Sequence, residues 1–245
     1  MDKISLGILM RLRYDRFAEL NLRSILSLAV CAGYLLFYTS CSKKWDETCD
    51  TSVYFELAGT GGSTCAVSRF EVNISDFAIS GKRMQGEGFS VDSKSLQANS
   101  NLLLNTESAV LFTTFEQRQG TYTNMDFEFT FDKLGDTPAL QIEAVYDLTN
   151  EEEGESDTTY LHISLNSKSI IRKTMYDISK NLVAGSNYGI YLSVDLNYLL
   201  GGITATMIEE AATDDDELII VDENTNSTIY NAVYERTLSS FTVRF

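Results

Sequence analysis

The chain has few of the residues on which metal centres, proton relays and flexible linkers depend. Its 245 residues include one histidine, His162, and one proline. A lone imidazole does not build a His-based metal centre, and two cysteines with one distant histidine do not make a zinc site. No His-Glu-x-x-His, Gly-x-Ser-x-Gly or P-loop pattern is present. These absences argue against the enzyme classes that such patterns mark, and we expect no catalytic residues.

Basic residues are also scarce. The chain has 19 Lys and Arg against 35 Asp and Glu, a net charge of −16. Residues 1–40 hold five of the basic and three of the acidic residues, so residues 41–245 keep 14 basic and 32 acidic residues, a net charge of −18. A field of this sign repels nucleic acid and anionic lipid head groups. We therefore expect no nucleic-acid partner.

Apolar residues, in contrast, are plentiful enough for a packed core. Hydrophobic residues make up 44% of the chain and aromatic residues 11%, which excludes disorder over most of its length. No Pro- or Ser-rich stretch marks a boundary. We expect a single domain over residues 52–245; the alternative is two small domains that meet near the acidic stretch 151–157.

The first forty residues have the layout of a secretory signal. A basic segment, residues 1–24, precedes fourteen uncharged residues, Ile25–Tyr38. That run is short for a membrane span, which needs about 20 apolar residues. We expect residues 1–40 to be a signal peptide, with translation starting at Met1 or Met10. The alternative is an uncleaved N-terminal anchor.

Thr39-Ser40-Cys41 resembles the lipobox of bacterial lipoproteins. The resemblance implies cleavage before Cys41, acylation of its thiol (palmitate or a similar chain) and of its new amino group, and a tether over residues 41–51. Lys43 and Lys44, followed by Asp46 and Glu47, resemble the surface-export signal of Bacteroidota lipoproteins. This second resemblance implies a lipid-anchored, surface-exposed protein of the outer membrane.

Two further cysteines, Cys49 and Cys65, remain after processing. They stand sixteen residues apart in an exported chain, and oxidising compartments favour pairing. We expect a disulfide between them; the alternative is two unrelated thiols.

Alternation of apolar and polar residues is the dominant pattern. It is clearest in residues 125–131, 161–165 and 188–196, where every second residue is apolar, as in half-buried strands. The apolar register changes between Ile74 and Phe77, which predicts a bulge near Ser75 and Asp76. Many short strands separated by turn residues predict a mainly β protein, an antiparallel β-sandwich.

Helical spacing is rare. Residues 227–239 repeat apolar side chains at three and four positions, and Asn226 can cap such a helix. The pattern predicts a strand over Phe241–Phe245 after this helix. The sequence thus predicts one short C-terminal helix before the last strand, with a further short helix over residues 196–200 as an option.

The layout of hydrophobic runs resembles β-sandwich domains of unknown function in Bacteroidota lipoproteins. The segments that carry the resemblance are residues 102–104, 119–127, 188–197 and 226–230. The chain is more loosely similar to fimbrillin-like proteins. The resemblance implies a β-sandwich on a lipid anchor; fimbrillin likeness would imply a pilus subunit, and neither carries a catalytic residue to this sequence.

Acidic and tyrosine side chains are the candidates for ligand contacts. Carboxylate oxygens suit Ca²⁺, and the candidate ligands are Glu151, Glu153, Asp157, Asp214 and Asp216, although such clusters are more often solvated loops. We expect no other cofactor. Exposed tyrosines could stack on sugar rings, and the candidates are Tyr146, Tyr160, Tyr191 and Tyr198.

These observations favour a surface-anchored, non-enzymatic lipoprotein with a binding or structural role. Its membrane contact would be the N-terminal lipid, and its partner a glycan or a protein. Two alternatives stay open: an exported carbohydrate-active hydrolase that uses two carboxylates, and a fimbrial or pilus-related subunit.

Overall fold

The computed structural model describes residues 45–59, 61, 64–148, 158–176, 178, 180–215 and 217–245. The chain divides into two compact units, Met1–Glu47 and Thr48–Phe245, and the description below concerns the second. Within the described residues, no helix is long and apolar enough to cross a lipid bilayer. The expected signal peptide and acylated Cys41 lie outside the described residues.

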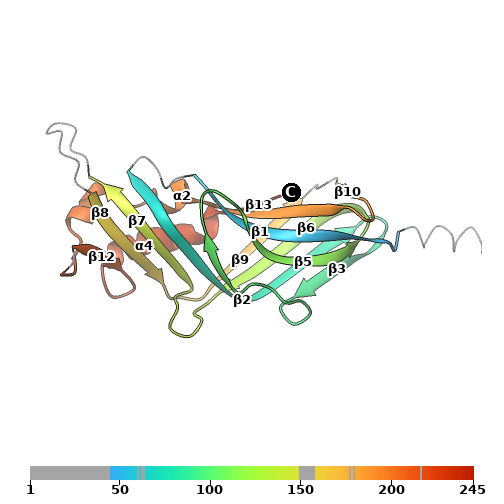
Figure 1. The fold of residues 1–245 in the computed structure, drawn as a ribbon, viewed down its shortest axis with the longest axis horizontal. Coiled ribbons are helices and arrows are strands. Elements are labelled where there is room, and N and C mark those ends of the chain that lie inside the picture. Colours follow the sequence, from blue (N-terminus) through green and yellow to red (C-terminus); the bar gives the residue numbers. More distant parts are fainter. Residues whose placement is uncertain are drawn as a thin grey trace, which may run out of the picture. The chain divides into compact units, whose positions relative to one another are not determined.

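The second unit is mainly β, with short helices near its C-terminus (Figure 1). The strands are β1 (Thr48–Ala58), β2 (Cys65–Arg83), β3 (Gly86–Asp92), β4 (Asn101–Leu104), β5 (Val110–Arg118), β6 (Gly120–Phe131), β7 (Leu140–Asp147), β8 (Thr158–Leu165), β9 (Ser169–Tyr176), β10 (Asn181–Leu182), β11 (Asn187–Asp195), β12 (Leu218–Val221) and β13 (Phe241–Arg244). The helices are α2 (Leu196–Leu200), α3 (Ala205–Glu209) and α4 (Ser227–Ser240). The predicted helix before the last strand is therefore confirmed.

Two sheets form a sandwich-like fold. The four-stranded sheet has the order β13-β11-β1-β5. The larger sheet runs β10-β6-β2-β7-β8-β12, with β3 and β4 on the other edge of β2 and β9 on β6. The prediction of a mainly β, sandwich-like fold is confirmed, and most strand pairs are antiparallel, as expected. The β1–β11 and β8–β12 pairs are parallel, because long crossover connections separate the strands of each pair in the sequence.

Strand β2 is long and connects the two parts of the larger sheet (Figure 1). Its first half pairs with β4 and β7, and its second half pairs with β3 and β6. The β2–β6 register shifts between Ile74 and Asp76, which confirms the predicted bulge. Because a bulge increases local twist, the two halves of the sheet curl relative to each other.

The core lies between the inner faces of the two sheets. Phe55 of β1 contacts Phe112 of β5 and Phe129 of β6 edge to face, with ring centroids 5.6 and 5.3 Å apart. Every second residue of β6 from Met125 to Phe131 is buried. The predicted inward register of Phe127 and Phe129 is confirmed.

Strand β1 begins within the segment that the sequence predicts to be tether. It starts at Thr48, so residues 48–51 belong to the four-stranded sheet. Cys49 and Thr51 are buried while Asp50 is exposed. The sequence places the boundary too late because its apolar alternation starts only at Val53, whereas the first inward positions are a cysteine and a threonine.

A polar network on β2 joins three segments of the larger sheet. The Glu71 carboxylate accepts hydrogen bonds from Asn101 Nδ2 (2.7 Å) and Arg69 Nη2 (2.8 Å). Asn101 Nδ2 also donates to Asn73 Oδ1 (2.8 Å), and Asn73 Nδ2 donates to the carbonyl of Pro138 (2.6 Å). The hydrogen bond from Asn101, followed by the contact with Arg69, holds the pKa of Glu71 below its usual value.

Replacing the Glu71 carboxylate should make the free energy of unfolding less dependent on pH in the acid range. A carboxyl whose folded pKa is depressed stabilises the fold above its unfolded pKa of about 4.3, and this contribution is lost as pH falls through the folded pKa. Glu71→Gln should therefore lower the free energy of unfolding by about 1–2 kcal/mol at pH 7, and the difference from the wild type should shrink in acid. Urea titrations at pH 7 and pH 3 measure it. Glu87→Gln, at a highly exposed position, is the control and should change little at either pH.

Candidate functional site

The four candidate tyrosines do not form one site. Tyr146 is 4% exposed, because β7 directs it inward together with Leu140, Ile142 and Ala144. A buried tyrosine does not stack on a ligand, so its assignment as a ligand contact is corrected. The sequence was misleading here because a tyrosine suits either face of a half-buried strand.

Two other candidate tyrosines are exposed but lie on different elements. Tyr160 is on the outer face of β8, where it is 61% exposed and lies in register with Val145 and Leu218. Tyr198 is on α2, and the guanidinium of Arg236 lies over its ring, 5.3 Å from the centroid. Neither is among the residues that line the hollow at Tyr191.

Tyr191 lines a hollow on the outer face of the four-stranded sheet, where β1 and β11 lie side by side. The register of these parallel strands places Asp50 opposite Asn187, then Ser52 opposite Gly189, then Tyr54 opposite Tyr191. These three pairs form successive rows on the solvent-facing side, spaced about 6.6 Å apart along the strands. The first row is polar, the second consists of small residues and the third is aromatic.

The hollow has a volume of about 360 Å³, within the size range of small-molecule sites. Its lining residues are Asp50, Ser52, Tyr54, Thr114, Asn187, Tyr188, Gly189 and Tyr191. Because Gly189 has no side chain, the middle row forms the floor of the hollow. A Cβ at this position would approach the Tyr191 ring to 2.9 Å. The small middle row thus separates a polar end from an aromatic wall.

The aromatic wall is held in place from one side. The rings of Tyr54 and Tyr191 stack with centroids 5.2 Å apart and planes 16° apart. The guanidinium of Arg244 lies 4.5 Å from the Tyr191 centroid and donates to both Glu56 carboxylate oxygens at 2.8 and 2.9 Å. Ser193 also donates to Glu56. Because each partner is itself fixed, the wall is ordered before any ligand arrives.

The polar end, in contrast, keeps its hydrogen-bonding capacity. Ser52 and Thr114 hydroxyls bond to each other at 2.9 Å. Among the described residues, no side-chain hydrogen bond or ion pair engages the Asp50 carboxylate, the Asn187 amide or the hydroxyls of Tyr54 and Tyr191. The hollow therefore offers acceptors at Asp50, donors and an acceptor at Asn187, and two phenolic hydroxyls at the opposite end.

Most of this site could not be recognised in the sequence. Only one part of it is indicated by a local pattern: the alternation in residues 187–195 places Gly189 and Tyr191 on one outward face. Asp50 and Tyr54 were missed because they align with β11 only through a parallel pairing across more than 130 residues. A local pattern does not report such a register.

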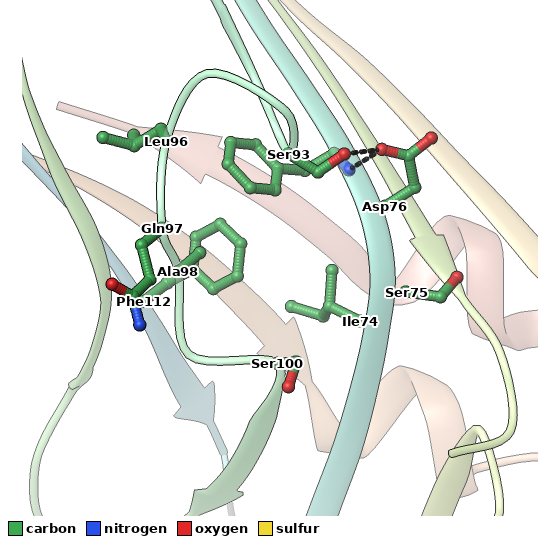
Figure 2. A pocket seen from close by; sticks show the side chains of 10 residues that line it. Ile74, Ser75, Asp76, Ser93, Leu96, Gln97, Ala98, Ser100 and Phe112 are labelled. Atoms are coloured by element: carbon green, nitrogen blue, oxygen red, sulfur yellow. Dashed lines mark hydrogen bonds between the residues drawn. The ribbon is translucent and has the colours of Figure 1, made fainter. Parts of the chain in front are cut away.

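A second concavity lies where the β2 bulge meets the loop between β3 and β4 (Figure 2). It has a volume of about 240 Å³. Its lining residues are Ile74, Ser75, Asp76, Phe77, Ser93, Leu96, Gln97, Ala98, Ser100 and Phe112. Unlike the hollow on the four-stranded sheet, it opens between the strands toward the apolar core.

The expected disulfide is not formed. Cys49 and Cys65 are both free thiols, and both are buried. Cys49 belongs to the four-stranded sheet, where its thiol donates to the carbonyl of Gln117, whereas Cys65 opens β2 in the other sheet. Burial raises the pKa of each thiol to about 11, which keeps both protonated and unreactive at neutral pH.

Of the acidic candidates for a metal site, only Asp214 lies within the described residues. Glu151, Glu153, Asp157 and Asp216 lie outside the described residues. Asp214 Oδ1 accepts a hydrogen bond from the backbone N–H of Leu218 at 2.9 Å, and the N–H of Asp214 donates to the carbonyl of Leu218. Asp214 is thus engaged with the start of β12. No group of three or more His, Cys, Asp or Glu suited to a metal ion occurs in the part of the chain that the structure describes.

A comparison of the chain with protein-family models, with curated proteins and with solved structures found no match.

Proposed function

We propose that this chain is a surface-anchored, non-enzymatic lipoprotein that binds a saccharide in the hollow between β1 and β11. The observation that carries the proposal is the three-row arrangement of Asp50 and Asn187, Ser52 and Gly189, and Tyr54 and Tyr191. The lipobox-like segment at Cys41 supports the anchor.

The chemistry of the hollow suits a ligand rich in hydroxyl groups. A saccharide hydroxyl both donates and accepts, so it can donate to Asp50 and accept from the Asn187 amide. Sugar C–H groups suit aromatic surfaces, and tyrosines present an apolar body with a polar tip. The low floor at Gly189 leaves room for a ring between the two ends. The free carboxylate disfavours anionic ligands by repulsion, in line with the acidic chain as a whole.

Binding fits the hollow better than hydrolysis does. Two carboxylates, Asp50 and Glu116, are neighbours across β1 and β5, as a glycosidase would require. Both are exposed, whereas a catalytic acid relies on an apolar setting that keeps its carboxyl group protonated. The hollow also lies on the open face of a sheet, where water has free access.

The test is saccharide binding by the full chain on a glycan array, followed by calorimetry with the best hit. Asp50→Asn should weaken binding at least tenfold, because losing one hydrogen bond to a charged group costs about 1.5–3 kcal/mol. Tyr54→Ala should also weaken binding, because it removes one of the two stacked rings of the aromatic wall. Tyr160→Ala removes an exposed tyrosine from the other sheet and is the matched control, with unchanged affinity expected. Equal losses in all three variants, or no bound saccharide, would contradict the proposal.

A further inference from the structure

The cavity at the β2 bulge is built by a loop that crosses a gap in the sheet edge. Residues 93–100 connect β3 to β4, which both pair with β2 but on opposite sides of the bulge. Backbone hydrogen bonds fix the crossing: Ile74 N–H donates to Ser100, and Asn99 N–H donates to Phe112. We call residues 93–100 the strap. The strap is thus fastened to both sheets, and the cavity beneath it is a fixed feature of the fold.

The inner part of the cavity is apolar and rigid. Phe77 and Phe112 meet edge to face with centroids 5.0 Å apart, and Ile74 completes the buried floor. Leu96 and Ala98 of the strap close the opposite side. A dry cavity of about 150 Å³ in a protein core already accepts benzene. A cavity of about 240 Å³ with these walls suits one aromatic ring or a branched alkyl group.

The rim carries one charge, that of Asp76. One carboxylate oxygen of Asp76 accepts from the Phe77 N–H at 2.9 Å and from the Ser93 hydroxyl (Figure 2). Its second oxygen has no hydrogen-bond partner among the described residues, and no ion pair within them reaches this carboxylate. The other rim side chains are neutral: Ser75, Gln97 and Ser100. The rim therefore attracts a cation and repels an anion.

We propose that this cavity binds a small organic amine whose apolar ring or branched alkyl group fills the space under the strap, while its ammonium group pairs with Asp76. The apolar group displaces water from Phe77, Phe112 and Ile74. The ammonium stays at the rim, where it keeps part of its hydration and donates to the free oxygen of Asp76. The site is independent of the saccharide hollow, which shares none of its lining residues.

The test compares three probes that share a phenylethyl group on the full chain by ligand-observed NMR titration. 2-Phenylethylamine, 2-phenylethanol and 3-phenylpropionate differ in the charge at the end of the same chain length. The amine should bind about fivefold more tightly than the alcohol, since two charges about 4 Å apart in water attract by about 1 kcal/mol. The carboxylate should bind most weakly.

Two variants separate the parts of the proposal. Asp76→Asn should abolish the preference for the amine and leave the alcohol unaffected. Ala98→Leu should block all three probes by filling the cavity, while Ala78→Leu, at an exposed position of β2 outside it, should leave binding unchanged. Equal affinity of amine and alcohol for the wild type, or unaltered binding to Ala98→Leu, would overturn the proposal. Saccharide binding by Asp76→Asn should be unchanged. The proposal for the amine cavity and the proposal for the saccharide hollow can therefore be refuted separately.

Discussion

Phe127→Ala should destabilise the domain by about 3–5 kcal/mol. Phe127 is 2% exposed on the inner face of β6, and it pairs across the sheet with Ile79 of β2. Truncating a buried phenylalanine loses its transfer free energy and leaves a cavity that the neighbours fill only in part. Because domains are stable by about 5–15 kcal/mol in total, the variant should melt many degrees lower or fail to accumulate in soluble form. Thermal unfolding followed by circular dichroism measures the shift.

The next residue of the same strand provides the control. Glu128 faces solvent and pairs with Arg172 Nε at 2.8 Å, with the two side chains 43% and 66% exposed. Exposed ion pairs contribute about 0–1 kcal/mol, so Glu128→Gln should leave the melting temperature almost unchanged. A one-residue slip of register would exchange the two faces of β6. Larger damage from Glu128→Gln than from Phe127→Ala would therefore disprove the observed register.

The strands that the sequence predicts well are those with one buried and one solvated face. In β6, β8 and β11 the period of two is regular, and the residues predicted to point inward are buried, except Tyr188 at the start of β11, which is partly buried. The bulge at Ser75 and Asp76 was also predictable, because a strand whose apolar register changes must bulge or bend to keep both apolar sets on its buried face. Local alternation is set by burial, so it can be read without knowing which strand lies alongside.

The partner of each strand could not be predicted from local alternation, and the candidate site depends on these pairings. The parallel pairing of β1 with β11 brings Asp50 to Asn187 and Tyr54 to Tyr191, and nothing local in either segment specifies it. The same limit explains the cysteine error. Sixteen residues of spacing suggested a loop closed by a disulfide, but the chain passes between sheets in that interval, and each thiol is buried in its own sheet.

The helix before the last strand shows how tertiary contacts override a local rule. Asn226 precedes α4 as an N-cap residue should, yet it adopts a left-handed conformation (φ 54°) and makes no capping hydrogen bond. Its side chain instead donates to the carbonyls of Ala212 and Ile220 and accepts from the N–H of Ala212. The bond to Ile220 satisfies a carbonyl of β12, and unpaired groups on such a strand would otherwise invite pairing with another chain.

Cys41→Ala should convert the protein from a membrane-bound to a soluble form. If the lipobox-like segment is processed as proposed, Cys41 is the only attachment point for lipid, and stable anchoring needs more than one acyl chain. The variant would lack all of them. Membrane and soluble fractions of cells, probed for the chain, give the distribution, and metabolic labelling with palmitate reports the lipid directly.

Cys31→Ala is the matched control, because it removes a cysteine from the apolar run Ile25–Tyr38 without touching the processing site. It should label and fractionate like the wild type. An uncleaved anchor makes the opposite prediction: the apolar run would hold the chain in the membrane whether or not Cys41 is present. Membrane retention of Cys41→Ala at its full, unprocessed mass would therefore refute acylation at this residue, and with it the proposed lipid anchor.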